Sequence, residues 1–311
     1  MSPLSKVLIT GGRGLVGSAL LRVLRANGFA NIEAPRSDEL NLCEQEQVRV
    51  AMDAIHPDWI FHCAARVGGI VGNAKAPADF IRDNLLMQTN VIEAARRSGV
   101  RKLLFLGSAC VYPKFANNPI QESSLMTGEL EPSNRAYAIA KIAGIEMCQA
   151  YRKQYGCNFI AAMPTNLYGL SDHYDLENSH VLPGMIRRMH EAKTAGQPSV
   201  TLWGTGQPTR EFLFADDLAE ACLFLMNYYD EGALINIGSG QEIPLYVAAN
   251  HVKNAVEYKG WIEWDTSKPD GTPRRQLDSS KIFELGWKPK VSLEDGLARA
   301  YLDFVCRTTV L

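Results

Sequence analysis

The amino-acid sequence predicts an α/β protein in which a doubly wound parallel sheet is followed by a smaller C-terminal lobe. Short β-branched or aromatic runs alternate with helix-length segments in the first half of the chain, and a glycine-rich turn follows the first run. After about residue 166 the pattern changes to loops rich in Gly, Pro, Asn and Ser. The alternation predicts right-handed βαβ units, and the change of pattern predicts the second lobe.

The strands of the sheet are predicted from five short runs. In the fourth run Leu103, Leu104, Phe105 and Leu106 are consecutive apolar residues, as expected of a strand that helices cover on both faces. Two long segments, 76–98 and 133–155, are predicted to be helices between strands. The predicted strands are 6–10, 31–35, 59–65, 102–108 and 157–164.

The second half of the chain is predicted to build the smaller lobe. We assign residues 1–165 to the first domain and residues 166–311 mainly to a substrate-binding lobe, with some segments expected to return to the first domain. The elements predicted here are a helix at 181–195 and short strands at 199–203, 234–238 and 261–264.

The composition excludes several classes of function. Charged residues make up 21% of the 311 residues and the formal net charge is -2, so the surface has no general attraction for nucleic acids or anionic membranes. No stretch approaches the roughly 20 consecutive apolar residues of a membrane helix, and we expect a soluble, cytoplasmic protein. The seven cysteines are scattered without a Cys-x-x-Cys pair, which predicts reduced thiols and no metal site.

The glycine-rich turn follows the first predicted strand and opens a helical segment. Its glycines fit the G-x-G-x-x-G spacing, which lets the backbone approach a pyrophosphate whose charge the N-terminal N–H groups of a helix meet. Three glycines alone could simply form a tight turn, but this position in an alternating α/β chain favours dinucleotide binding. The residues assigned to the turn are Gly11, Gly12, Arg13, Gly14, Leu15, Val16 and Gly17.

The end of the second predicted strand indicates which dinucleotide is bound. An NAD enzyme usually places Asp or Glu near this point to bond the ribose 2′-hydroxyl, whereas this chain has Arg36. The guanidinium groups of Arg36 and Arg13 suit a 2′-phosphate, which predicts NADP(H) as the cofactor. Taken alone, Arg36 would be an ordinary solvated arginine. Residues 1–165 are therefore predicted to be an NADP-binding domain of the Rossmann type.

Three further residues fit a hydride-transfer site. Tyr137 and Lys141 lie one turn apart on a predicted helix, so the ammonium is expected to lower the pKa of the phenol and to hold the cofactor ribose. Ser108 ends the fourth predicted strand, at the carboxyl edge where ligands of open α/β sheets bind. A Tyr-x-x-x-Lys pair also occurs in ordinary amphipathic helices, but its position after Ser108 and the glycine turn favours catalysis.

Ser108, Tyr137 and Lys141, in this order behind the glycine turn, resemble the extended short-chain dehydrogenase/reductases over nearly the whole chain. The resemblance implies catalytic roles for these three residues and a role near the cofactor for Asn84. Further cofactor contacts are implied at the strand ends and in the second half of the chain, by His62, Cys63, Ala64, Ala65, Leu106, Gly107, Pro164, Thr165, Asn166, Leu167 and His180.

Longer motifs resemble one family within this group, the GDP-L-fucose synthases. They are RVGGI at 66–70, SACVYP at 108–113, PTNLYG at 164–169, NSHV at 178–181, REFL at 210–213 and KPDGTPR at 268–274. The resemblance implies a GDP-linked keto-deoxysugar as the substrate and a homodimer formed through the two long helices. It also implies that Cys110 and His180 are the acid/base pair of an epimerisation, and that the GDP-sugar contacts Arg188, Trp203, Arg210 and Asp270.

Residue types alone would favour ordinary structural roles for several of these positions. An isolated cysteine such as Cys110 is usually a small buried hydrophobe, and an isolated histidine such as His180 is usually structural. Trp203 ends a strand-like run and would be assigned to the core, while Arg188 and Arg210 would be surface charges. The motifs around these residues favour the functional interpretation.

The chemistry expected of these residues is coherent in itself. A ketone at sugar C4 acidifies the protons at C3 and C5, and a base and an acid on opposite faces can invert each centre through an enolate. We expect neighbouring charge to lower the pKa of Cys110 so that it acts as the base near neutral pH. Two alternatives stay open: an epimerase-reductase or reductase for a related GDP-4-keto-deoxysugar or GDP-heptose, and a non-catalytic NADP-binding sensor or scaffold.

Overall fold

A parallel sheet of six strands forms the centre of the larger lobe. The computed structural model describes residues 1–176, 179–268 and 270–309. The strand order is β2-β1-β3-β4-β5-β9, with every neighbouring pair parallel, and this confirms the predicted fold class. The strands are β1 (Val7–Thr10), β2 (Ile32–Glu33), β3 (Trp59–His62), β4 (Lys102–Leu106), β5 (Phe159–Pro164) and β9 (Ile235–Ile237).

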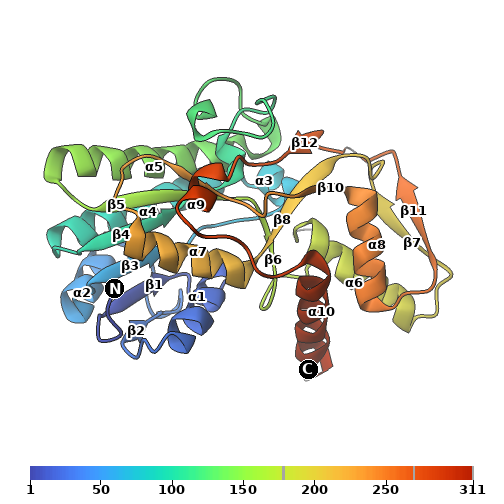
Figure 1. The fold of residues 1–311 in the computed structure, drawn as a ribbon, viewed down its shortest axis with the longest axis horizontal. Coiled ribbons are helices and arrows are strands. Elements are labelled where there is room, and N and C mark those ends of the chain that lie inside the picture. Colours follow the sequence, from blue (N-terminus) through green and yellow to red (C-terminus); the bar gives the residue numbers. More distant parts are fainter. Residues whose placement is uncertain (177–178, 269, 310–311) are drawn as a thin grey trace.

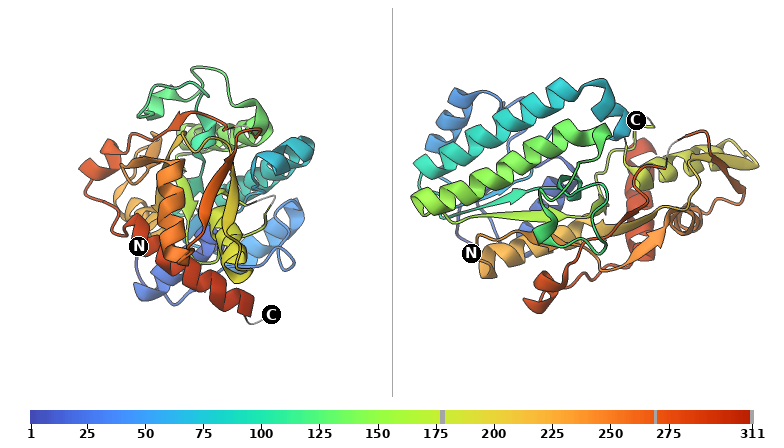
Figure 2. Two further views of the ribbon diagram at one scale, coloured as in Figure 1. Left: turned by 90° about the vertical axis from the view of Figure 1, so that its right-hand side faces the viewer. Right: turned by 90° about the horizontal axis from the view of Figure 1, so that it is seen from above.

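Helices cover both faces of this sheet, which explains its unbroken apolar strands (Figure 1). Val7 and Ile9 of β1 belong to the core beneath α1 (Leu15–Ala26) and α7 (Ala215–Tyr228), whereas Leu8 belongs to the core on the opposite face. The opposite face carries α2 (Gln45–Ile55), α4 (Pro77–Arg97) and α5 (Arg135–Tyr155). The two long helices α4 and α5 lie side by side along the sheet (Figure 2).

The smaller lobe lies beyond one end of this sheet, on the right of Figure 1. Its own sheet pairs β8 with β6, β10 and β12, while β7 and β11 form a separate parallel pair. A third apolar core joins these strands to α6, α8 and α10. The strands are β6 (Asn166–Tyr168), β7 (Ser199–Trp203), β8 (Thr209–Phe214), β10 (Glu242–Pro244), β11 (Trp261–Asp265) and β12 (Arg274–Arg275), and the helices are α6 (Val181–Thr194), α8 (Leu245–Val256) and α10 (Leu293–Thr309).

The chain crosses between the two lobes more than once. The strand predicted at 234–238 is β9, which pairs with β5 at the edge of the central sheet. Helix α7, which precedes β9, packs against α1, and α9 (Ser280–Glu284) also returns to this side. Two short helical segments, α3 (Ile70–Lys75) and the 3-10 turn η1 (Ala109–Val111), follow β3 and β4 near the junction of the lobes. Within the described residues, no helix combines the length and apolar character needed to cross a bilayer.

A buried lysine ties α7 to the central sheet. Lys102, at the start of β4, is 1% exposed, and its Nζ donates to the carbonyl oxygens of Leu225, Met226 and Tyr229 at 2.9, 3.0 and 2.7 Å. The last carbonyls of a helix have no partner within the helix, so this ammonium satisfies the end of α7 and complements its dipole. Nζ also donates to Asp230 Oδ1 at 2.9 Å. Burial lowers the pKa of Lys102, and Asp230 opposes that shift.

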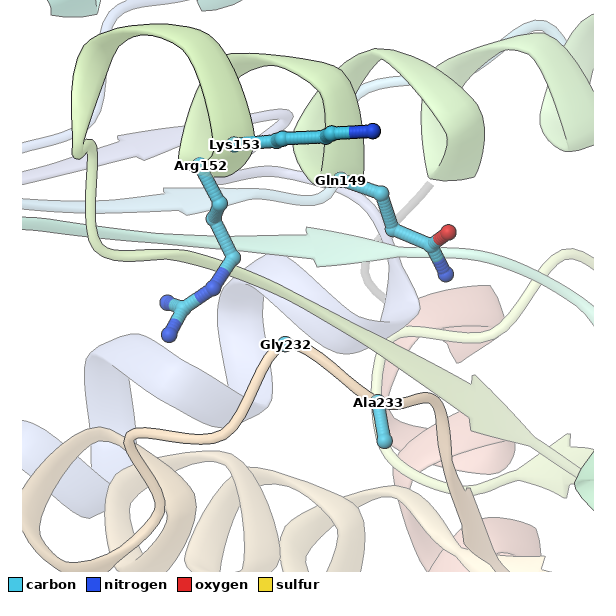
Figure 3. Close-up of a pocket in the computed structure, with 5 residues that line it drawn as sticks. All are labelled: Gln149, Arg152, Lys153, Gly232 and Ala233. Atoms are coloured by element: carbon cyan, nitrogen blue, oxygen red, sulfur yellow. The ribbon is translucent and has the colours of Figure 1, made fainter.

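A shallow hollow lies close to this connection, between the end of α5 and the loop after α7 (Figure 3). Arg152 turns toward the loop, where it donates to the carbonyl oxygen of Asp230, whereas Lys153 runs along α5 away from it. The hollow is lined by Gln149, Arg152, Lys153, Gly232 and Ala233, all of them remote from the candidate active site described below.

Lys102→Met is expected to lower the free energy of unfolding by about 3 kcal/mol, because it leaves buried carbonyl groups without donors. Denaturant unfolding followed by circular dichroism measures the change. Lys153→Met removes an exposed ammonium from the neighbouring helix and should change stability by less than about 0.5 kcal/mol. Equal stability of the two variants would contradict a capping role for Lys102.

Candidate active site

The glycine turn lies at the point where the strand order of the central sheet reverses, between β1 and β3. Ligands of open α/β sheets bind outside the carboxyl ends of strands at such a point. Gly11 has a φ of +73°, and a Cβ there would lie 2.9 Å from the backbone of Ala64 after β3. A larger residue would therefore be strained and would force the two strand ends apart.

The turn presents an open helix N-terminus. A Cβ on Gly17 would lie 2.1 Å from the carbonyl oxygen of Gly11, so only glycine lets α1 begin this close to the turn. Helix α1 begins after Gly14 without a side-chain cap and has no acidic residue in its first turn. Its first N–H groups therefore fit an anion, as the pyrophosphate of a dinucleotide requires. This cradle fits the predicted cofactor.

The two arginines predicted to select NADP(H) are both exposed. The guanidinium of Arg36 forms an ion pair with Asp38, with Nη2 2.6 Å from Oδ2, and its backbone N–H donates to Glu39 Oε2 at 2.8 Å. Gly12 packs against Ala34 at the end of β2, which brings the turn next to the segment that carries Arg36. A 2′-phosphate in this place would compete with Asp38 for Arg36.

Lys141 is buried beside β4, with its Nζ 2.8 Å from the carbonyl oxygen of Leu106 and 4.7 Å from the Phe105 ring centroid. Burial lowers the pKa of Lys141 to about 8. Burial raises the pKa of the Tyr137 phenol well above its ordinary value. Ser108, rather than Lys141, is the neighbour that opposes this rise, so the predicted lowering of the phenol pKa by Lys141 is wrong for this structure.

Cys110 lies in the 3-10 turn after β4 and is 6% exposed. Its backbone N–H donates to Ser108 Oγ at 3.4 Å. The expected net lowering of the thiol pKa is wrong, because burial raises it and outweighs the opposing influence of Ser108, Arg275 and Lys141. The structure nevertheless brings Cys110, Ser108, Tyr137 and Lys141 into one cluster.

His180 lies at the N-terminus of α6, on a segment of the other lobe. Desolvation lowers the pKa of its imidazole, and His173 lowers it further. His180 and Cys110, the predicted acid/base pair, come from separate segments, because Cys110 lies in η1 after β4 and His180 precedes α6. His173, whose effect on His180 the sequence did not indicate, lies in the loop between β6 and α6.

The loop that contains His173 is anchored to the C-terminal helix. Tyr174 packs against Phe304 with ring centroids 4.6 Å apart, and its hydroxyl donates to the carbonyl oxygen of Ala300 at 3.0 Å. Asp172 is 5% exposed; its Oδ1 accepts the N–H of His173 at 2.7 Å, while its Oδ2 has no hydrogen-bond partner among the described residues. Burial raises the pKa of Asp172 to about 7.

Three of the predicted substrate residues lie around the end of β7. Trp203 is 47% exposed, and the guanidinium of Arg188 lies 5.2 Å from its ring centroid. Lys268 Nζ lies 5.8 Å from the same ring. Asp270 accepts from the N–H and the hydroxyl of Thr205 at 2.7 and 2.8 Å, which fixes it beside the turn after β7. An exposed indole flanked by cations and a fixed carboxylate suits a nucleotide ligand.

The fourth predicted substrate residue, Arg210 on β8, has an unpredicted neighbour. Arg275 of β12 is its partner in the parallel pairing of the two strands. Burial lowers the pKa of Arg210 to about 10, Arg275 lowers it further, and Asp270 opposes the change. Arg275 also neighbours Cys110, as its effect on the thiol shows. The sequence did not indicate Arg275, because β12 has only two residues and lies at the end of the loop motif at 268–274.

Several residues with predicted cofactor roles form hydrogen bonds with other protein groups near the strand ends. Asn84 is 2% exposed and exchanges hydrogen bonds with the backbone of Arg66, so it fixes the loop after β3. His62 is fully buried, and its Nδ1 is 2.7 Å from Thr10 Oγ1. The N–H of Thr165 donates to the carbonyl oxygen of Ile237 at 3.0 Å. The remaining predicted positions, Ala65, Gly107, Pro164, Asn166 and Leu167, adjoin the carboxyl ends of β3, β4 and β5.

Comparison with known proteins relates this arrangement to nucleotide-sugar enzymes. Residues 7–238 match the family described as "NAD dependent epimerase/dehydratase family". GDP-L-fucose synthase 1 of Arabidopsis thaliana is 54% identical over 297 residues, which cover 96% of this chain and 92% of that protein. Among the described residues, no group of three or more His, Cys, Asp and Glu side chains is placed to hold a metal ion.

Two solved structures share the fold over almost the whole chain. A GDP-6-OMe-4-keto-L-xylo-heptose reductase from C. jejuni is 35% identical with a TM-score of 0.94, covering 99% of each chain. A GDP-L-fucose synthetase from Naegleria fowleri bound to NADP is 26% identical with a TM-score of 0.92, covering 99% of this chain and 96% of the other.

Asp172→Asn is expected to stabilise the protein increasingly as the pH rises from about 4 to 7 and by a constant amount above pH 7. Because the folded-state pKa is raised to about 7, the folded protein retains a proton that the unfolded chain has already lost in this range, and wild-type stability falls as the pH rises. Denaturant unfolding at pH 4.5, 6 and 8 measures this. Asp53→Asn, at an exposed site on α2, controls for the loss of a negative charge. A pH-independent difference between Asp172→Asn and the wild type would contradict the burial argument.

Proposed function

We propose that this chain, which belongs to the NAD dependent epimerase/dehydratase family, acts as a GDP-L-fucose synthase that uses NADPH to convert GDP-4-keto-6-deoxy-D-mannose into GDP-L-fucose. The observation that carries the proposal is the position of Ser108, whose Oγ accepts the backbone N–H of Cys110 at 3.4 Å and whose side chain opposes the rise in the pKa of both the Tyr137 phenol and the Cys110 thiol. A phenol suited to proton donation in reduction and a thiol suited to epimerisation therefore share one polar neighbour.

The reduction step requires a proton donor beside the C4 oxygen. Bound NADPH supplies the hydride that C4 receives. Tyr137 gives its proton to the C4 oxygen, and Ser108 donates a hydrogen bond to the same oxygen while it gains negative charge. Lys141, buried beside Leu106, would hold the cofactor ribose, and a solvent proton restores the phenol after the transfer. One hydride and one proton convert the ketone into an alcohol.

The epimerisation step requires proton transfer on both faces of the sugar. Cys110 first loses its thiol proton to solvent, and the thiolate then takes the proton from C3 or C5 and becomes a thiol again, while Ser108 and Tyr137 stabilise the enolate oxygen at C4. His180 returns a proton to the opposite face, which inverts the centre. The origin of Cys110 and His180 on separate lobes supports this division of roles, because the substrate would lie between them.

The competing assignments differ in which of these residues they need. A GDP-heptose reductase, the activity named for the C. jejuni structure, needs the reduction residues alone. The presence of Cys110 and His180 together favours an enzyme that also epimerises. A non-catalytic NADP-binding sensor would have no need for the cluster of Ser108, Tyr137 and Lys141.

Incubation of the purified protein with GDP-4-keto-6-deoxy-D-mannose and NADPH tests the proposal, with the product identified by proton NMR. We expect GDP-L-fucose with one NADPH consumed for each sugar. A product reduced at C4 with unchanged C3 and C5 would assign a reductase, and the absence of NADPH consumption would favour the sensor.

Cys110→Ser and Tyr137→Phe are expected to separate the two chemistries. In deuterated water, Cys110→Ser should lose most of the deuterium incorporation at C3 and C5 but still reduce the uninverted ketone slowly, because its phenol and ammonium are intact. Tyr137→Phe should bind NADPH normally and lose reduction by about 100-fold or more, the usual contribution of a general acid. Full deuterium exchange by Cys110→Ser would assign the base to another residue.

NADPH is expected to be preferred over NADH because Arg36 and Arg13 are available to the 2′-phosphate. Arg36→Ala should weaken NADPH binding by about tenfold or more while leaving NADH binding unchanged, as the loss of a charge-assisted hydrogen bond implies. Asp38→Asn is the matched variant, because it removes the carboxylate that competes for Arg36, and it should tighten NADPH binding. Fluorescence titration measures both, and equal affinities of the wild type for the two cofactors would overturn the assignment.

The oligomer and compartment implied by the family also belong to this proposal. A homodimer through α4 and α5 is supported by the exposure of Leu86 and Ile139, at 41% and 39%, on these adjoining helices.

Residence in the cytoplasm is supported by the seven cysteines, all of which are free thiols, as a reducing compartment favours.

Ile139→Glu is expected to shift the protein from dimer to monomer, because it would place a charge within the apolar contact of the two long helices. Light scattering coupled to size-exclusion chromatography measures the mass. Val50→Glu, at a 51% exposed position on α2, is the matched control and should leave the dimer intact. A wild-type protein that is monomeric at micromolar concentration would contradict the proposed interface.

A further inference from the structure

The loop between β6 and α6, which ends at His180, contains a residue in an unusual backbone conformation. The loop comprises residues 169–180, of which 177 and 178 lie outside the described part of the chain. Ser171 has a φ of +65°, in the left-handed region that glycine adopts freely and that other residues occupy at a cost. Such a conformation persists where the surrounding structure fixes it. The contacts of Ser171 therefore indicate what holds this loop.

The C-terminal helix α10 supplies these contacts. The backbone N–H of Ser171 donates to Asp303 Oδ2 at 2.8 Å. Arg307, one helical turn further along α10, donates from Nη1 to the same oxygen at 3.3 Å and to the carbonyl oxygen of Asp172 at 3.1 Å. The Asp303–Arg307 pair therefore binds both ends of the Ser171–Asp172 dipeptide.

An ion pair four residues apart on a helix is often a solvated surface contact that contributes little to the structure. Two observations distinguish the Asp303–Arg307 pair from such a contact. The Asp303 side chain is only 21% exposed, and its Oδ2 accepts the Ser171 N–H as well as the guanidinium. Within the described part of the chain, this N–H has no other acceptor. Loss of the Asp303 carboxylate would therefore release the strained backbone of Ser171.

The rest of the loop connects this anchored start to His180. Arg188 of α6 donates from Nη2 to the carbonyl oxygen of Leu176 at 3.1 Å, which attaches the middle of the loop to the helix that His180 precedes. The N–H of Ser179 donates to the carbonyl oxygen of Asp175 at 3.0 Å. These bonds join the two described parts of the loop, so a shift at its start would also move His180.

The start of the loop lies near His180 in space as well. His173, which directly follows the anchored dipeptide, is close enough to lower the pKa of the His180 imidazole. The proposed function gives this imidazole the delivery of a proton to one face of the sugar. Misplacement of a catalytic group by about 1 Å can lower a rate about 100-fold, so the conformation of the loop matters for this step.

We propose that Asp303 is a positioning residue for His180, because through the backbone of Ser171 it holds the β6–α6 loop in the conformation that brings the imidazole to the substrate. This inference rests on the proposed function and extends it to a residue of the C-terminal helix. Asp303 itself has no contact with the reacting atoms in this assignment.

Asp303→Ala tests the inference through the ratio of two products. In the proposed mechanism, inversion needs His180 whereas C4 reduction does not. With GDP-4-keto-6-deoxy-D-mannose and NADPH, the ratio of GDP-L-fucose to the uninverted C4 alcohol should therefore be about tenfold or more lower than in the wild type. Proton NMR of the products measures this ratio. Because both products come from one sample, the ratio does not depend on how much of the variant is folded.

Further variants separate the loss of the hydrogen bond from other effects of the substitution. Asp303→Asn keeps an oxygen that can accept the Ser171 N–H and should stay within about threefold of the wild-type ratio. Ser171→Gly, introduced into Asp303→Ala, removes the steric cost of the left-handed conformation and should restore the ratio to within about threefold of the wild type. Asp295→Ala is the matched control on α10, because its carboxylate accepts no hydrogen bond from the described residues, and it should behave as the wild type does.

Titration of the His180 imidazole by proton NMR gives a second readout that does not require turnover. Its signal is assigned by its loss in His180→Asn. The pKa should lie below the ordinary histidine value in the wild type, move toward that value in Asp303→Ala, and return when Ser171→Gly is added.

The inference is overturned if Asp303→Ala keeps the wild-type product ratio, or if Ser171→Gly does not restore a ratio that was lost. If the wild type forms no GDP-L-fucose, the proposed function fails and the titration alone decides the inference. An unchanged His180 pKa in Asp303→Ala then overturns it, whereas the expected shift and its reversal by Ser171→Gly support it.

Discussion

The junction of the two lobes depends on the hydrogen bonds that the buried carboxylate of Glu211 accepts. Its oxygens accept the N–H groups of Gly240 and Leu277 at 2.8 and 3.0 Å, which joins the segments after β9 and after β12 to β8. Its backbone carbonyl accepts hydrogen bonds from the side chains of Thr165 and Asn166 at 3.3 and 2.9 Å. These bonds join the segment that follows β5 of the central sheet to β8. Burial raises the pKa of Glu211, and these donors compensate for a carboxylate that forms no ion pair within the described part of the chain.

The same constraint positions residues of the proposed substrate site. Arg210 precedes Glu211, and Arg275 lies two residues before Leu277, so the carboxylate on one face fixes the guanidinium pair on the other. Asn236 performs a related task on β9, where it accepts from the Tyr112 hydroxyl at 2.6 Å and donates to the carbonyl oxygen of Ile120 at 2.9 Å. That bond fixes the chain just beyond Cys110. Buried polar groups at the lobe junction thus hold reactive groups that come from distant parts of the sequence.

Local patterns in the sequence were enough to predict the central strands, the long helices and the glycine turn, because each depends on residues close together in the chain. The grouping of Ser108, Tyr137 and Lys141 followed from their order on a sheet of known handedness. Arg275 could not be predicted, since its importance comes from the register of β12 with β8. The pKa of Cys110 was predicted with the wrong sign because burial, which depends on packing from both lobes, outweighs the nearby cations.

Burial moves the reactive groups of the site away from their charged forms. It raises the pKa of Tyr137 and Cys110 and lowers that of Lys141 and His180. A thiol held in its neutral form is a poor nucleophile, so Cys110 is protected from oxidation and from adding to a keto group before the substrate is oriented. In the proposed mechanism, proton abstraction by Cys110 depends on the nearby cations Lys141 and Arg275, which favour the thiolate.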